Sequence, residues 1–268
     1  MSSPSKYSAL IFDIGDVLFT WSAKTKTSIS PKSLGMIIKS SIWDDFERNR
    51  ISQETCYKQA GEKFGLAPEE IATAFQQATD SLRSDDRLIS VIRDLKAASQ
   101  GQLRVFAMSN ISLPHYQVLR TKPADWEIFD ELFASGAVGE RKPDLKFYKH
   151  VIAKTGIDPQ KAIFVDDKVE NVLTARAFGF TGIVFDDVSN VIRNLRNLLG
   201  DPVKRGQDFL NSNAKKLESV TDTGVVVKEN LTQLLILEST ENKDLVNLPD
   251  PCPRLWNFLR GTSSNLLR

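Results

Sequence analysis

Short apolar runs alternate along the chain with longer segments whose apolar residues recur at helical spacing. The runs predict strands, the first with a turn, at 7–19, 103–108, 129–135, 162–165 and 181–185. Helical patterns separate the later runs, for example at 147–155 and 171–178. Strands that alternate with helices form right-handed crossovers. The pattern therefore predicts an α/β fold with a mostly parallel sheet.

A long helical block interrupts this alternation after the first strand. Residues 31–98 carry helix starts near Ser52 and Pro68, and a fourth amphipathic helix spans 85–98. We expect an inserted helical cap at 21–98 over a core of 7–20 plus 99–190. Residues 191–268 form a C-terminal extension, with helical patterns at 191–199 and 231–237.

Composition and charge narrow the class of protein. The chain has 268 residues, of which 41% are hydrophobic and 26% are charged, and a formal net charge of +1. No basic stripe indicates nucleic-acid binding. The two cysteines lie far apart, and we expect no signal peptide and no membrane span. A reducing cytoplasm is the expected location, and the oligomeric state is left open.

Polar side chains stand at the ends of the predicted strands or in the loops that follow them. They are Asp13, the pair Ser109 and Asn110, Lys142, and the pair Asp166 and Asp167. Ligands of open α/β sheets bind outside these strand ends. Adjacent buried carboxylates repel each other unless a cation intervenes.

These residue types suit phosphoryl transfer. Asp13 can attack phosphorus as a nucleophile. Mg²⁺ bridging Asp13 and Asp167 offsets the charge of an anion that attacks another anion. Ser109 and Asn110 are predicted to bind phosphoryl oxygens, and Lys142 neutralises the nucleophile and the phosphoryl group. The predicted substrate is a small phosphorylated molecule.

In their order, these motifs resemble those of the haloacid dehalogenase-like hydrolase superfamily over about residues 8–187. The matching segments are Phe12 to Leu18, Met108 to Asn110, Lys142-Pro143, and Val165 to Asp167. The resemblance implies a Rossmann-like three-layer α/β sandwich with a small cap. It also implies a metal site built from Asp13, the backbone carbonyl of Gly15, Asp167 and Asp166.

The chain departs from this pattern at position 15. Phosphatases of the superfamily have a second aspartate there, which protonates the leaving group, whereas this chain has Gly15. General acid–base help is worth about 10²–10⁴-fold, so slow turnover or a substitute group is expected. Asp16 is the nearest substitute.

A narrower resemblance concerns Asp166 to Glu170 and the C-terminal extension. The segments 231–238 and 254–258 look like the junction after the hydrolase-like domain of fungal drimane-type sesquiterpene synthases. Their cyclase motif Asp-x-Asp-Thr-Thr is absent here. This resemblance suggests a prenyl or sesquiterpenyl phosphate as the substrate and a role in terpenoid biosynthesis.

Two alternatives stay open from the sequence. One is a metal-independent 2-haloacid dehalogenase, since those enzymes also lack the second aspartate, although Asp166 and Asp167 favour a metal. The other is a degenerate, non-catalytic domain that binds a phosphorylated ligand or a partner.

Other conspicuous residues have structural interpretations. His115 and His150 have no metal-ligand partner at suitable spacing. Trp21, Trp43 and Phe46 are expected in the core or, alternatively, in an apolar substrate pocket under the cap. The segment 47–50 is expected to be an exposed helix end or, alternatively, to face the site.

Overall fold

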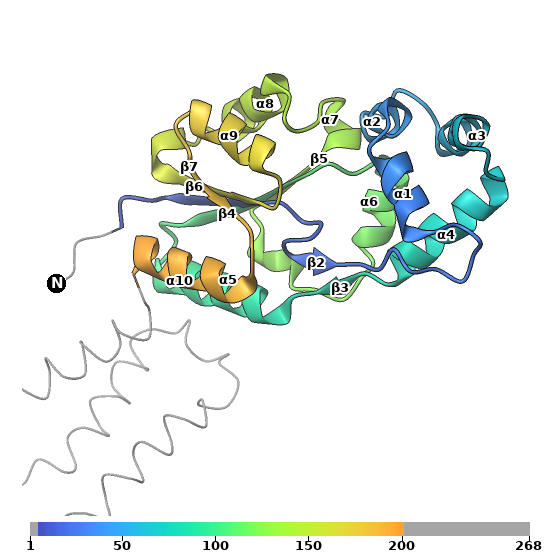
Figure 1. The fold of residues 1–268 in the computed structure, drawn as a ribbon. Helices are drawn as coiled ribbons and strands as arrows, with labels where there is room; N and C mark the ends of the chain where they lie inside the picture. The colour runs from blue at the N-terminus through green and yellow to red at the C-terminus, as the bar shows by residue number, and fades with distance from the viewer. Residues whose placement is uncertain (1–4, 201–268) are drawn as a thin grey trace, which may run out of the picture. The chain divides into compact units, whose positions relative to one another are not determined.

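The computed structural model describes residues 5–200, and its centre is a five-stranded parallel sheet in the order β5-β4-β1-β6-β7 (Figure 1). The strands are β1 (Ala9–Phe12), β4 (Arg104–Ser109), β5 (Glu131–Ala134), β6 (Ala162–Asp166) and β7 (Thr181–Val184). Every neighbouring pair runs parallel. The predicted parallel α/β sheet is therefore confirmed.

Alternation along the strands divides the core into two apolar layers. Leu10 and Phe12 face α5 (Asp86–Ala98) and α10 (Val188–Leu199). Ala9 and Ile11 face the opposite side, where α8 (Leu145–Thr155) and α9 (Val169–Ala177) pack. Successive side chains of a strand point to opposite faces of a sheet. Figure 1 shows one helical layer on each side of the sheet, which makes the predicted three-layer sandwich.

Four helices pack into a cluster of their own, apart from the helices that cover the sheet. They are α1 (Pro31–Ile38), α2 (Ser41–Glu47), α3 (Gln53–Phe64) and α4 (Pro68–Asp80). Serines cap the first three: Ser30, Ser40 and Ser52 each accept a hydrogen bond from a backbone amide of the first turn. Their buried faces share one apolar cluster, which includes Trp43, Phe46 and Phe75.

A short antiparallel ribbon marks where the chain leaves the sheet layer and returns to it. Its strands are β2 (Phe19–Thr20) and β3 (Arg83–Ser84). We expected the helix at 85–98 to belong to the cap, but the buried residues of α5 lie in the cluster against the sheet. The broad apolar face of α5 finds its largest apolar partner there. We propose that the cap comprises residues 21–82.

The boundary between the core and the C-terminal extension also differs from the expectation. The helix at 191–199 was assigned to the C-terminal extension, yet in α10 the side chains of Val191, Ile192 and Leu195 are buried in the sheet cluster. Its apolar stripe therefore completes one layer of the core. The expected helix at 231–237 and the segment 254–258 lie outside the described residues.

Short elements connect these parts. They are α6 (Leu113–Leu119), η1 (Trp126–Ile128), α7 (Ser135–Val138) and η2 (Pro159–Lys161). The predicted end of α8 at Gly156 is confirmed, with Gly156 at a φ of 64°. Between residues 5 and 200, no helix has both the length and the apolar character needed to cross a membrane.

Candidate active site at the strand ends

Three neighbouring strands carry the predicted polar residues to one edge of the sheet. Asp13 directly follows β1, Ser109 is the last residue of β4, and Asp166 is the last residue of β6. Since β1 lies between β4 and β6, these ends are adjacent. The Asp13 amide extends the ladder by donating to the Val165 carbonyl at 2.8 Å. Ser109 is buried beside them, and its contact with a phosphoryl group stays a prediction.

Lys142 reaches into this edge from the loop that follows α7. Its side chain is wholly buried, and its Nζ lies 2.9 Å from Asp13 Oδ1 and 2.7 Å from Asp166 Oδ2. One ammonium group therefore joins two carboxylates that belong to different strands. That Asp13 is a nucleophile and Lys142 its neutralising cation stays a prediction.

The buried setting shifts the pKa values of this group of charges. Burial raises the pKa of Asp13 to about 7, the positive charge of Lys142 opposes that rise, and Asp166 adds to it. Burial by itself lowers the pKa of Lys142, but Asp13 and Asp166 outweigh it, so the pKa of Lys142 is raised. Lys142 is thus held as a cation, and its charge favours the ionised form of Asp13.

Asn110 has a contact that the sequence did not predict. Its Nδ2 donates to the Lys142 carbonyl at 2.9 Å, and its Oδ1 accepts from the Lys142 amide at 2.7 Å. Both polar atoms of the Asn110 side chain therefore form hydrogen bonds with the backbone of Lys142. The expected contact of Asn110 with a phosphoryl oxygen stays a prediction.

Three carboxylates at this edge suit a divalent metal ion. Oxygen atoms of Asp13, Asp166 and Asp167 all lie within 4.8 Å of one another. Asp166 is completely buried and also accepts from Asn171 Nδ2 at 2.9 Å. Asp167 is less buried and pairs with Lys168. Carboxylate oxygens at such separations are ligands that Mg²⁺ prefers, and its charge also favours ionised Asp13.

Position 15 leaves space beside the nucleophile. A Cβ atom added to Gly15 meets no other atom within 4 Å, and the φ of Gly15 is not in the left-handed region. Asp16 has a φ of 58° and a largely exposed side chain. Burial raises the pKa of Asp16, a hydrogen bond from Trp21 opposes the rise, and Asp167 adds to it. The negative charge of Asp167 therefore acts on Asp16.

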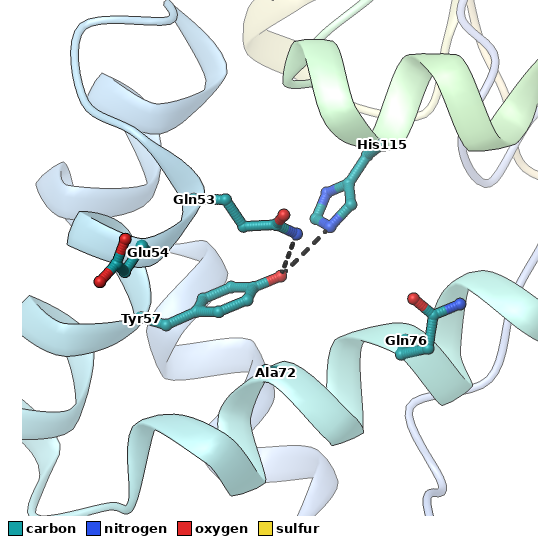
Figure 2. A pocket seen from close by; sticks show the side chains of 6 residues that line it. All are labelled: Gln53, Glu54, Tyr57, Ala72, Gln76 and His115. Atoms are coloured by element: carbon teal, nitrogen blue, oxygen red, sulfur yellow. Dashed lines mark hydrogen bonds between the residues drawn. The ribbon is translucent and has the colours of Figure 1, made fainter.

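A pocket of about 330 Å³ lies where the cap helices α3 and α4 approach α6. It is lined by Gln53, Glu54, Tyr57, Ala72, Gln76 and His115. In Figure 2 the side chains of Gln53 and His115 converge on the Tyr57 hydroxyl. Gln53 Nε2 donates to that hydroxyl at 2.8 Å, and His115 Nε2 lies 3.4 Å from it.

The aromatic residues of the cap surround His115. The rings of Trp43, Phe46 and Phe75 lie 5.5–6.2 Å from the His115 ring, centroid to centroid. Burial lowers the pKa of His115 to about 4, so the imidazole is neutral at physiological pH. Trp43 and Phe46 belong to the buried cluster of the cap and not to the residues that line the pocket.

Sequence reasoning assigned no role to four residues that contact the predicted site residues or stand next to them in the structure. Lys168 pairs with Asp167, and Asn171 holds Asp166. Glu47 and Arg141 form an ion pair beside Lys142. Asn171 follows the motif that ends at Asp167, and Arg141 directly precedes Lys142. Nearness in sequence to these motifs was therefore the signal that could have found both residues. Glu47 lies 95 positions before Lys142 in the chain, and the sequence offers only the alternative that the segment 47–50 faces the site.

This chain belongs to the haloacid dehalogenase-like hydrolase family. The model of that family matches residues 7–179, which include every predicted site residue. A second model, the sesquiterpene cyclase astC-like C-terminal domain, matches residues 203–266. The hydrolase and terpene-synthase resemblances of the sequence are both confirmed.

Two curated fungal relatives cover different shares of the chain. Drimenol cyclase drtB of Aspergillus calidoustus is 40% identical over 256 residues, which is 96% of this chain and 48% of that protein. This chain therefore spans about half the length of that relative. Sesquiterpene phosphatase astK of Aspergillus oryzae is 44% identical over 194 residues, which is 72% of this chain and 97% of that protein.

Solved structures support the fold. A HAD-like family hydrolase of Porphyromonas gingivalis has a TM-score of 0.56 at 24% identity, covering 74% of this chain and all of that chain. A HAD family enzyme of Bacteroides thetaiotaomicron, solved with magnesium and inorganic phosphate, has a TM-score of 0.52 at 20% identity. That match covers 69% of this chain and 98% of the other.

Proposed function

We propose that this protein is a Mg²⁺-dependent phosphatase that hydrolyses the phosphate ester of a prenyl or sesquiterpenyl alcohol in terpenoid biosynthesis. The observation that carries the proposal is the placement of Lys142 Nζ between Asp13 and Asp166, with Asp167 in the same cluster. This arrangement supplies a nucleophile, a neutralising cation and a metal site together. The 44% identity to a sesquiterpene phosphatase supports the substrate class.

In the proposed reaction a carboxylate oxygen of Asp13 forms a bond to phosphorus, and the bond from phosphorus to the ester oxygen breaks. The alcohol takes up a proton and leaves. Water then attacks the phosphorus of the aspartyl-phosphate, inorganic phosphate departs, and the Asp13 carboxylate is regenerated. Lys142 stays charged throughout and stabilises the negative charge at the nucleophile.

Asp13, Asp166, Asp167 and the Gly15 carbonyl are the proposed ligands of Mg²⁺. When bound, the ion would offset the charge of the phosphoryl group. Gly15 offers no proton for the leaving alcohol, so we propose Asp16 as the substitute donor. The raised pKa of Asp16 supports this role.

The pocket at the cap is proposed to hold the hydrocarbon part of the substrate. Tyr57, Ala72 and the neutral His115 give it an apolar side, against the aromatic cluster of the cap. Its volume of about 330 Å³ is within the range of small-molecule sites.

Phosphate release from a panel of prenyl, sesquiterpenyl and sugar phosphates tests this function. We expect release only with Mg²⁺, the fastest release from the terpenoid phosphates, and none from Asp13→Asn. Failure to release phosphate from any of them would contradict the proposal. Turnover of a 2-haloacid that survives a chelator would instead favour the dehalogenase alternative.

A further inference from the structure

The cap helix α2 and the residue that follows it contact the loop that carries Lys142. The contacts lie on both sides of Lys142 in the chain. Arg141 Nε donates to Glu47 Oε2 at 2.8 Å, and Arg141 Nη1 lies 3.0 Å from Asp44 Oδ1. Beyond Lys142, Asp144 pairs with Arg48. The segment expected to be an exposed helix end is therefore partly buried against the core.

Glu47 is the central residue of this contact. Its side chain is only 9% exposed, and both carboxylate oxygens are engaged. One oxygen accepts from Trp43 Nε1 of the aromatic cluster at 3.0 Å, and the other faces Arg141. The Glu47 carbonyl also accepts from Ser135 Oγ at 2.8 Å, on the core side. A single residue thus joins the interior of the cap to the loop of Lys142.

The energetic cost of separating these groups is large. A buried carboxylate that loses its cation is an uncompensated charge, which is strongly unfavourable. Burial already raises the pKa of Glu47, and Arg141 opposes that rise. Displacement of the cap would break this pair and leave the loop held only from the core side, through Asn110 and the two aspartates.

We infer that Glu47 is a positioning residue, which holds Lys142 in register with Asp13 through Arg141 when the cap is docked. The inference rests on the proposed function, because it concerns the charge that Lys142 places beside the nucleophile. Small misplacements of such a group cost up to about 10²-fold in rate. The effect belongs to the chemical step and not to substrate affinity.

Steady-state kinetics of Glu47→Gln in the full chain test the inference. Glutamine keeps the volume and an acceptor for Trp43 but loses the charge. We expect kcat to fall by about 10-fold or more with little change of KM, the sign of an interaction that matters in the transition state. Arg141→Gln should show the same loss, and the double variant should lose no more than either single variant.

Asp45→Asn is the matched control. It removes the exposed pair of Asp45 and Arg50, 3.1 Å apart at the same end of α2. This variant should keep the kinetics of the wild type. An unchanged kcat in Glu47→Gln, or additive losses in the double variant, would overturn the inference.

Hydrogen exchange of the peptide 139–145 gives a second measurement that does not depend on activity. In Glu47→Gln this peptide should exchange faster than in the wild type, whereas strands β1 and β6 should exchange as before. If kcat falls without faster exchange at 139–145, the loss does not pass through the loop and the inference fails. An inactive wild type would instead refute the proposed function itself.

Discussion

At the scale of single residues, the site depends on one cation shared between strands. Lys142 is buried without solvent contact, and the carboxylates of Asp13 and Asp166 stabilise its charge. The unusual residue is Gly15, where the family resemblance predicts a second aspartate and where an added Cβ atom meets nothing within 4 Å. Two predictions belong to this scale.

Gly15→Asp is expected to raise kcat. The backbone at this position has room for a side chain, because an added Cβ atom meets nothing within 4 Å. A general acid contributes up to about 10²–10⁴-fold, so a gain of ~10-fold is a conservative expectation. Phosphate release under saturating substrate measures it. Gly15→Asn, which matches the size but transfers no proton, should give no gain, and an equal gain from both variants would refute the explanation.

His115 is expected to make stability depend on pH. Burial lowers its folded-state pKa to about 4 from an ordinary value of 6.5, so the unfolded chain binds more protons between these values. Stability therefore falls as the pH drops from about 7 toward 4, by at most about 3 kcal/mol.

Thermal unfolding at pH 7.5 and pH 5 measures this effect. The difference in melting temperature between the two pH values should shrink in His115→Gln. His150→Gln, at an exposed position of α8, should leave the difference as it is in the wild type. An unchanged difference in His115→Gln would contradict the prediction.

At the scale of elements, the helices of the cap form the pocket that we propose holds the hydrocarbon part of the substrate. Helices α3 and α4 supply most of the pocket, and α6 adds His115 from the core side. Because α6 follows β4 directly, the pocket and the Ser109 end of the site are linked by a short stretch of chain. Substrate preference is therefore expected to respond to changes in α4.

Ala72→Phe is expected to fill part of the pocket and to discriminate between substrates. Each methylene group kept from the pocket costs about 0.8 kcal/mol, so KM for a sesquiterpenyl phosphate should rise by ~10-fold or more. KM for a short alkyl phosphate should stay the same. Ala153→Phe, at an exposed position of α8, is the control. Equal effects on both substrates would contradict the assignment of the pocket.

At the scale of the whole chain, the two family matches divide the sequence. The hydrolase model ends at residue 179 and the astC-like model begins at 203, on either side of α10. Helices α10 and α5 pack in the same apolar cluster of the sheet. We therefore propose that the hydrolase part extends to about residue 200 and includes α10.

A chain ending after Gly200 is therefore expected to fold and to keep the phosphatase activity, since every proposed site residue and both layers of the core are retained. A chain ending after Ser189 loses α10 and exposes the apolar face that it covers, so it should aggregate or melt at a lower temperature. Phosphate release and thermal unfolding of both chains measure this. An inactive chain 1–200 would show that later residues are needed.

The sequence by itself determined much of this protein, because its signals are local. Apolar runs and helical periodicity predicted the sheet and its helices, and serine and glycine marked helix ends such as those at Ser52 and Gly156. The convergence of Asp13 and Asp166 was also predictable, since parallel strands place their carboxyl ends at one edge, and Lys142 joins them from the loop after α7.

Only the tertiary structure decided which distant groups meet. The pairing of Glu47 with Arg141 and the surroundings of His115 depend on how the cap docks, and no local pattern encodes that docking. The contact of Asn110 with Lys142 depends on which loops meet at the strand ends. The boundaries that we propose for the cap and the core depend on packing in the same way. An amphipathic helix such as α5 or α10 shows in sequence that it has an apolar face, but only packing shows which surface that face covers.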